Sequence, residues 1–195
     1  MTDKFDGFAG KLVAPIMARM NAAAEAEAID LLDAADNANI LVLGFGPGVG
    51  IEMLAKRIVG GTILGIDPSN AMMKAAAKRN EAMVKIGRVR LERTTANAIS
   101  AAPASFDGVI AVNTIQLCEP IAPTLTELAR VMRPGATLVT ITHDWAAAHH
   151  AGTADAWMQM MSNAFAGGDF ERVEIRRGKS EKGKAIIIRA CKKFQ

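Results

Sequence analysis

Hydrophobic residues along the chain form either short continuous runs or longer segments in which they recur every three to four positions. The runs predict strands that are buried on both faces, and the recurring pattern predicts helices that pack one side against a core. Strands are predicted at 39–43, 62–66, 88–92, 106–112, 136–142, 172–177 and 184–190. Helices are predicted over 11–35, 52–59, 69–81 and 120–132, with Ser69 as the N-cap of the third.

The order of these elements defines the expected fold. Strands and helices alternate over most of the chain, which indicates βαβ units and a parallel sheet covered on both faces. The last two strands are joined by a short polar segment and predict a hairpin. We therefore predict an α/β fold with a doubly wound, Rossmann-like, seven-stranded and mostly parallel sheet that ends in an antiparallel C-terminal hairpin. Residues 1–195 are taken as a single domain, with 1–38 as an N-terminal helical lid segment and 39–195 as the core.

Composition changes this picture mainly by exclusion. Of the 195 residues, 50% are hydrophobic and 22% are charged, as in ordinary folded domains. The longest uncharged window, 37–51, is too short and too rich in glycine to cross a bilayer, and residues 1–10 lack the pattern of a signal peptide. The two cysteines, Cys118 and Cys191, form no CxxC pair. We therefore expect a cytoplasmic protein without a membrane span.

The net charge of +3 is unevenly distributed. Residues 171–195 carry nine basic and three acidic side chains. A basic segment can bind nucleic acid. However, Phe194 is the only aromatic residue in this segment on which nucleic-acid bases could stack. A charged edge hairpin that resists strand addition explains the segment better.

The candidate chemistry lies in two turns that directly follow strands, where ligands bind in open parallel sheets. The first is the glycine turn, residues 44–50, whose four glycines let the backbone bend sharply and approach a ligand. Its spacing matches neither GxGxxG nor the P-loop pattern, which excludes a P-loop NTPase. The second contains Asp67, placed where an acid accepts hydrogen bonds from ribose hydroxyls in Rossmann-like folds. Asp67 is also compatible with a role at the start of the following helix.

Four segments, in order, resemble the class I S-adenosylmethionine-dependent methyltransferases, particularly the small single-domain type that acts on small molecules or lipids. The resemblance covers roughly residues 40–142. It implies transfer of a methyl group from S-adenosylmethionine to a small-molecule acceptor, with S-adenosylhomocysteine as the other product. The segments are ILVLGFGPG at 40–48, GIDPS at 65–69, FDGVIAVNT at 106–114 and LARVMRPG at 128–135.

Position by position, the resemblance implies a cofactor site along these motifs. Gly44, Gly46 and Gly48 would wrap the methionine part of the cofactor. Asp67 would hold the ribose, and Met72 would pack on the adenine. Thr95 and Ala96 would contact the adenine edge. The methyl-donor end would be lined by Asn113 and Thr114. The full cofactor-binding set is Gly44, Phe45, Gly46, Gly48, Asp67, Pro68, Met72, Thr95, Ala96, Asn113 and Thr114.

Two positions depart from the family pattern. The family usually has an acidic residue two positions before the first glycine, where this chain has Val42, and often an aspartate where it has Thr95. These changes remove a carboxylate near the methionine end and one acceptor for the adenine amino group. A hydrogen bond to a charged group contributes about 1.5 to 3 kcal/mol. Weaker cofactor binding is therefore expected, and a non-catalytic S-adenosylmethionine-binding protein is an alternative.

Methyl transfer needs a base only when the acceptor carries a proton. His143 and Asp144 follow a strand at the ligand end of the sheet, so His143 is the candidate catalytic base. Its alternative role is to cap the strand or face solvent. Together with His149 and His150 these residues match no metal-site spacing, and we predict no metal. The acceptor would be covered by the N-terminal segment around Ile16, Met20 and Asn21 and by residues 143–161.

Two further function classes stay open. A nicotinamide-dependent oxidoreductase would share the glycine turn and the acid but needs glycine spacing that this chain lacks. An RNA methyltransferase using the basic tail would bind RNA in a salt-sensitive way. Residues 113–116, however, lack the Pro-Pro-aromatic signature of enzymes that methylate base amino groups. We expect a small-molecule partner and no nucleic acid, and a homodimer is compatible with the sequence.

Overall fold

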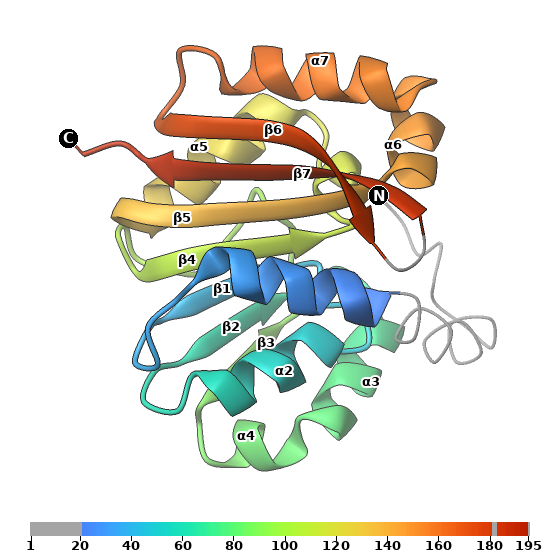
Figure 1. The fold of residues 1–195 in the computed structure, drawn as a ribbon. Helices are drawn as coiled ribbons and strands as arrows, with labels where there is room; N and C mark the ends of the chain where they lie inside the picture. The colour runs from blue at the N-terminus through green and yellow to red at the C-terminus, as the bar shows by residue number, and fades with distance from the viewer. Residues whose placement is uncertain (1–20, 181–182, 195) are drawn as a thin grey trace.

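The computed structural model describes residues 21–180 and 183–194, and within these ranges the strands form one seven-stranded sheet (Figure 1). The strand order is β3-β2-β1-β4-β5-β7-β6. The first five strands are parallel, and β7 pairs antiparallel with both β5 and β6. The predicted fold class is confirmed. The strands are β1 Ile40–Leu43, β2 Ile63–Ile66, β3 Val89–Glu92, β4 Phe106–Val112, β5 Met132–His143, β6 Phe170–Ser180 and β7 Gly183–Lys192.

The helices follow the strands as the sequence pattern predicts. Ser69 caps α3, because its Oγ accepts a hydrogen bond from the Met72 backbone N–H at 3.3 Å. Residues 21–32 are also helical, and the remainder of the predicted N-terminal helix, including Ile16 and Met20, lies outside the described residues. The other elements are α2 Val49–Arg57, α3 Asn70–Arg79, α4 Glu81–Lys85, the 3-10 helix η1 Ile115–Leu117, α5 Ile121–Val131, α6 Asp144–Ala151 and α7 Ala154–Phe165.

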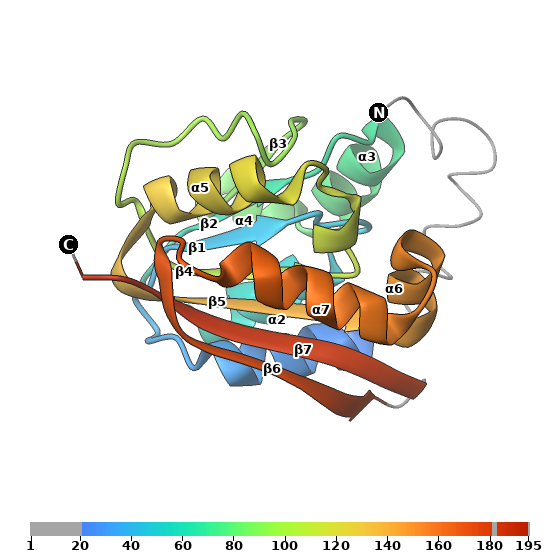
Figure 2. The same cartoon turned by 90° about the horizontal axis from the view of Figure 1, so that it is seen from above.

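Helices lie on both sides of the sheet (Figure 2), and each face of the sheet carries its own hydrophobic layer. The helix over 21–32, α2 and α3 cover one face, here called the α2 face, and α5 and α7 cover the other, the α5 face. Because successive side chains of a strand point to opposite faces, β1 divides between the two layers. Leu41 and Leu43 belong to the α5 face, whereas Ile40 and Val42 belong to the α2 face.

The segment after β5 differs from the sequence-based expectation, which placed no helix there. It forms α6 and α7, and the Thr153 Oγ1 caps α7 by accepting a hydrogen bond from the Ala156 N–H at 3.0 Å. In addition, β5 begins at Met132 rather than Ala136. The pairing with β4 shifts register between Phe106 and Gly108, and this irregularity accommodates the extra residues.

The sheet order positions the site. The carboxyl ends of parallel strands lie at one edge, so the turns after β1, β2, β4 and β5 are neighbours. The chain leaves β1 toward the α2 face and leaves β4 toward the α5 face. Such a divergence between adjacent strands opens a crevice in which doubly wound sheets bind their ligands. No helix among the described residues is long and apolar enough to cross a membrane.

Candidate cofactor and acceptor site

The glycine turn is held against the end of β2. The Gly44 N–H donates to the Ile66 carbonyl at 2.8 Å, and the Gly46 N–H donates to Asp67 Oδ2 at 3.0 Å. Gly46 has a φ of +50°, which side-chain-bearing residues rarely adopt, and its missing Cβ would meet no heavy atom within 4 Å. The turn therefore presents backbone to open space at the edge of the sheet.

Asp67 connects two turns through one carboxyl group. Besides the bond from Gly46, its Oδ1 accepts a hydrogen bond from the Ser69 N–H at 2.9 Å. Burial raises the pKa of Asp67 above its ordinary value, although the two backbone hydrogen bonds act in the opposite direction. An ionised carboxylate has about four acceptor sites, so these two bonds leave capacity for further donors. Its predicted role beside the following helix is thus present, together with room for a ligand.

A second turn, after β4, contacts the glycine turn directly. Thr114 Oγ1 lies 3.4 Å from the Gly44 carbonyl oxygen. A Cβ added at Gly44 would stand 2.1 Å from the same hydroxyl, and Gly44 itself has a φ of +68°. Only glycine fits between the two turns without displacing one of them.

Asn113 joins three elements at this edge. Its Oδ1 accepts a hydrogen bond from the His143 backbone N–H at 2.9 Å, and its Nδ2 donates to Asn21 Oδ1 at 3.0 Å. The His143 ring also meets this amide, with Nδ1 at 2.9 Å from Nδ2 and 3.1 Å from Oδ1. Asn113 has a φ of +50°, a conformation that asparagine tolerates better than most residues. The amide therefore fixes the orientation of the imidazole.

His143 is 3% exposed, which excludes the alternative in which it faces solvent. Its ring stacks on Trp145, with centroids 6.4 Å apart and an angle of 22° between planes. Asp144 does not orient the imidazole, because its Oδ2 pairs with Arg177 at 2.5 Å. A buried histidine beside an exposed aromatic ring marks the second half of the site.

The remaining predicted residues lie around this centre in three settings. Gly48 packs on α3, where the Asn80 side chain donates to its carbonyl at 3.1 Å. Phe45, Met72 and Ala96 are buried in the hydrophobic layers. Pro68 and Thr95 are exposed. The direct contacts therefore unite Gly44, Gly46, Asp67, Asn113, Thr114 and His143, whereas the others shape the surroundings.

Sequence reasoning missed one acid at the site, Glu25. It lies on the helix over 21–32, is 6% exposed, and its Oε2 would stand 2.2 Å from a Cβ added at Gly50. Burial raises the pKa of Glu25 to about 8. The available signal was its spacing, because Glu25 precedes Ala28 and Ile29 by three and four positions and so shares their buried helix face.

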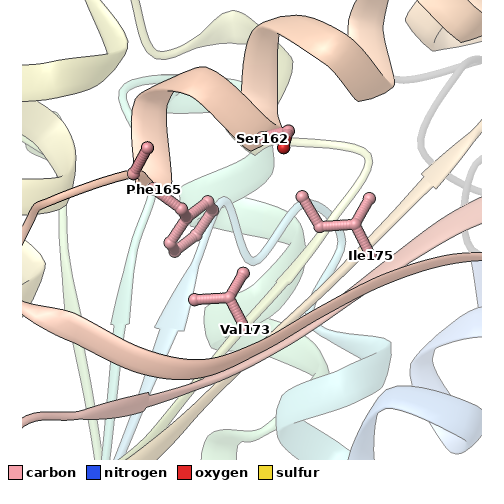
Figure 3. A pocket seen from close by; sticks show the side chains of 5 residues that line it. Ser162, Phe165, Val173 and Ile175 are labelled. Carbon is pink, nitrogen blue, oxygen red and sulfur yellow. The ribbon is translucent and has the colours of Figure 1, made fainter.

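The described residues contain no group of three or more His, Cys, Asp or Glu side chains placed to hold a metal ion. A pocket opens between α7 and the edge strand β6, three strands away from β4 in the sheet order (Figure 3). It is separate from the glycine turn. Its lining residues are Ser162, Phe165, Ala166, Val173 and Ile175.

Comparison with known proteins places this arrangement in a family. A family model described as a methyltransferase domain matches residues 40–135. The uncharacterized methyltransferase YdaC of Bacillus subtilis is 30% identical over 162 residues, which cover 83% of this chain and 87% of YdaC. An O-methyltransferase of Pyrenophora dematioidea is 36% identical over 77 residues, or 40% of this chain. The chain covers only about a third of the length of some curated relatives, and 29% of the length of the Pyrenophora dematioidea protein.

A solved structure agrees on the fold. The crystal structure of a SAM-dependent methyltransferase from Aquifex aeolicus superposes with a TM-score of 0.74 at 16% identity, covering 93% of this chain and 97% of that one. The match to YdaC extends over nearly the full length of both proteins and so includes the glycine turn, Asp67 and the Asn113–His143 edge. The chain therefore belongs to the class I S-adenosylmethionine-dependent methyltransferases.

Proposed function

We propose that this protein methylates a small-molecule acceptor, and that the methylated atom is a hydroxyl oxygen on a largely apolar body. The observation that carries the proposal is the meeting of the glycine turn, Asp67 and the Asn113–His143 pair at one edge of the sheet. A ligand in this crevice would touch all three, because β1 and β4 are adjacent strands. From the described helix over 21–32, Asn21 reaches the same edge of the sheet through its hydrogen bond with Asn113.

The residues present suit the family's cofactor. The position beyond Gly46 is open, and Asp67 keeps acceptor capacity for the two ribose hydroxyls. Thr114 and Asn113 would line the methyl-donor end. When bound, the cofactor supplies a methyl group made electrophilic by the positive sulfur. Orienting the acceptor and excluding water are the main tasks left to the protein.

His143 would remove the proton that a hydroxyl acceptor must lose. Asn113 holds the imidazole through Nδ1, which fixes its plane relative to the crevice. A positioned base of this kind contributes about 100- to 10,000-fold to the rate. The role is consistent with the position of His143 at the carboxyl end of β5 and next to β4.

Exposed apolar side chains beside His143 favour an apolar acceptor. Trp145 is 59% exposed and Leu117, on η1, is 44% exposed, while α6 and η1 contact each other. Large apolar side chains left at a crevice mouth commonly mark a ligand surface. Relatives named O-methyltransferases, from Pyrenophora dematioidea and Aspergillus nomiae, support oxygen as the acceptor atom.

The test is an acceptor screen with S-adenosylmethionine and hydroxylated aromatic compounds, together with their amine and thiol counterparts, in which mass spectrometry detects both the methylated product and S-adenosylhomocysteine. With the best acceptor, His143→Gln is expected to lower kcat about 100-fold or more while the affinity for S-adenosylhomocysteine stays within about threefold. His149→Gln is the matched control, because His149 is exposed on the neighbouring helix α6. Product formation unaffected by His143→Gln would reject the base assignment, and turnover only with nitrogen or sulfur acceptors would reject the hydroxyl.

A further inference from the structure

A buried acid, Glu25, lies next to the glycine turn. Within the described part of the chain, the Glu25 carboxyl makes no hydrogen bond or ion pair, although the residue is only 6% exposed. Burying a carboxyl group without a hydrogen-bond partner costs free energy. A hydrophobic residue at the same position of this apolar helix face would avoid that cost. Its presence therefore points to a partner that the described residues do not supply.

The carboxyl group lies against the first turn of α2. Its Oε2 approaches Gly50, the second residue of that nine-residue helix, so closely that a Cβ at Gly50 would stand only 2.2 Å away. The N-cap of α2 is Gly48, which has no side chain to cap the helix. One helical turn before Glu25, Asn21 reaches Asn113 at the crevice. The helix over 21–32 thus directs Asn21 and Glu25 toward the same edge of the sheet.

Val42 belongs to the same compartment. It points to the α2 face, in the layer that also contains Ala24, Ala28 and Ile51. This is the position two residues before the first glycine, where the family resemblance leads one to expect an acid. A carboxylate at position 42 would project into the layer that Glu25 enters from the opposite side. The chain therefore lacks the acid on the strand but has one on the facing helix.

We infer that Glu25 is a cofactor-binding residue, whose carboxylate pairs with the ammonium group of the methionine part of S-adenosylmethionine. The inference rests on the proposed function, because it uses the same crevice and the same ligand. It explains why a carboxyl group is buried beside the glycine turn without a partner among the described residues. It also explains how the family reaction is compatible with valine at position 42.

The charge state of the free protein agrees with this role. With a pKa of about 8, Glu25 is mostly protonated at neutral pH, which avoids an isolated buried charge. An ammonium group arriving beside it would favour the ionised form, because an opposite charge within a few ångströms lowers the pKa of a carboxyl. The acid is thus neutral without the ligand and charged with it.

The experiment compares two ligands that differ in the ammonium group. Isothermal titration of the full chain would measure the affinities for S-adenosylhomocysteine, which carries the amino-acid part, and for methylthioadenosine, which lacks it. Glu25→Gln is expected to weaken S-adenosylhomocysteine binding at least about tenfold and to leave methylthioadenosine binding within about twofold. Glu27→Gln, the same substitution on the same helix, is expected to change neither affinity.

Unchanged S-adenosylhomocysteine binding in Glu25→Gln would overturn the assignment. Equal losses for both ligands would also overturn it, because they would indicate that Glu25 supports the glycine turn as a whole. If the unsubstituted protein bound neither ligand nor S-adenosylmethionine, the proposed function would fail together with the assignment. Normal binding by the unsubstituted protein separates that failure from the first two.

Discussion

Two buried acids flank the glycine turn and differ in what surrounds them. Asp67 and Glu25 are 8% and 6% exposed, so burial does not distinguish them. Asp67 accepts backbone hydrogen bonds from Gly46 and Ser69, whereas Glu25 accepts none from the described residues. Burial raises the pKa of both acids, that of Glu25 to about 8. The comparison separates an acid that holds two turns together from an acid that has no partner among the described residues and for which we propose a ligand as the partner.

The largest predicted effect concerns the pH dependence of stability. The unfolded chain ionises Glu25 above its ordinary pKa of 4.5, while the folded protein keeps the proton up to about pH 8. The folded state therefore binds more protons in this window, and the Glu25 contribution to the free energy of unfolding is full below pH 4.5 and is lost as pH rises to about 8. At 1.36 kcal/mol per pKa unit, the loss amounts to as much as about 5 kcal/mol.

Urea denaturation of the ligand-free protein and of Glu25→Gln at several pH values would test this. Glutamine has nearly the same shape and does not ionise, so the variant is expected to lack the decline and to exceed the unsubstituted protein in stability at pH 8. Parallel pH curves for the two proteins would contradict a raised pKa at Glu25. Asp67 is present in both proteins, so its own contribution to the pH dependence of stability cancels when the two are compared.

The second largest effect is expected when Asp67 is replaced. Asp67→Ala leaves the N–H groups of Gly46 and Ser69 without their acceptor, which is expected to lower the free energy of unfolding by about 2 to 4 kcal/mol. It should also weaken S-adenosylmethionine binding at least tenfold, or about 1.4 kcal/mol. Calorimetric titration and urea denaturation measure the two quantities, and Asp36→Ala in an exposed loop is the control. Unchanged affinity would contradict the ribose assignment.

The smallest predicted effect concerns a double variant that transfers the acid from the helix over 21–32 to strand β1. Adding Val42→Glu to Glu25→Gln should recover about tenfold in S-adenosylhomocysteine affinity, because position 42 faces the same layer as Glu25. The control adds Val42→Gln instead, which supplies a similar shape without the charge and should recover nothing. Equal recovery by both variants would show that size at position 42, and not its charge, limits binding.

The sequence predicted most of the fold because its main signals are local. Continuous apolar runs marked the strands, the Ser69 cap marked the start of α3, and Asp67 was recognised by its place at the end of β2. The helices α6 and α7 were missed. Half of residues 144–151 are alanine and the segment has no clear apolar stripe, so α6 depends on its contacts with α7 and β7 rather than on its own pattern.

Within the site, the sequence alone determined the glycine turn and the residues that directly follow β2, β4 and β5, because chain order places them at strand ends. Only the tertiary structure decided that Asn113 contacts both His143 and Asn21. It also placed the Glu25 carboxyl against Gly50, on the face of the sheet toward which Val42 points. These contacts join segments far apart in the chain across a sheet face, and residue spacing carries no information on which side chains meet there.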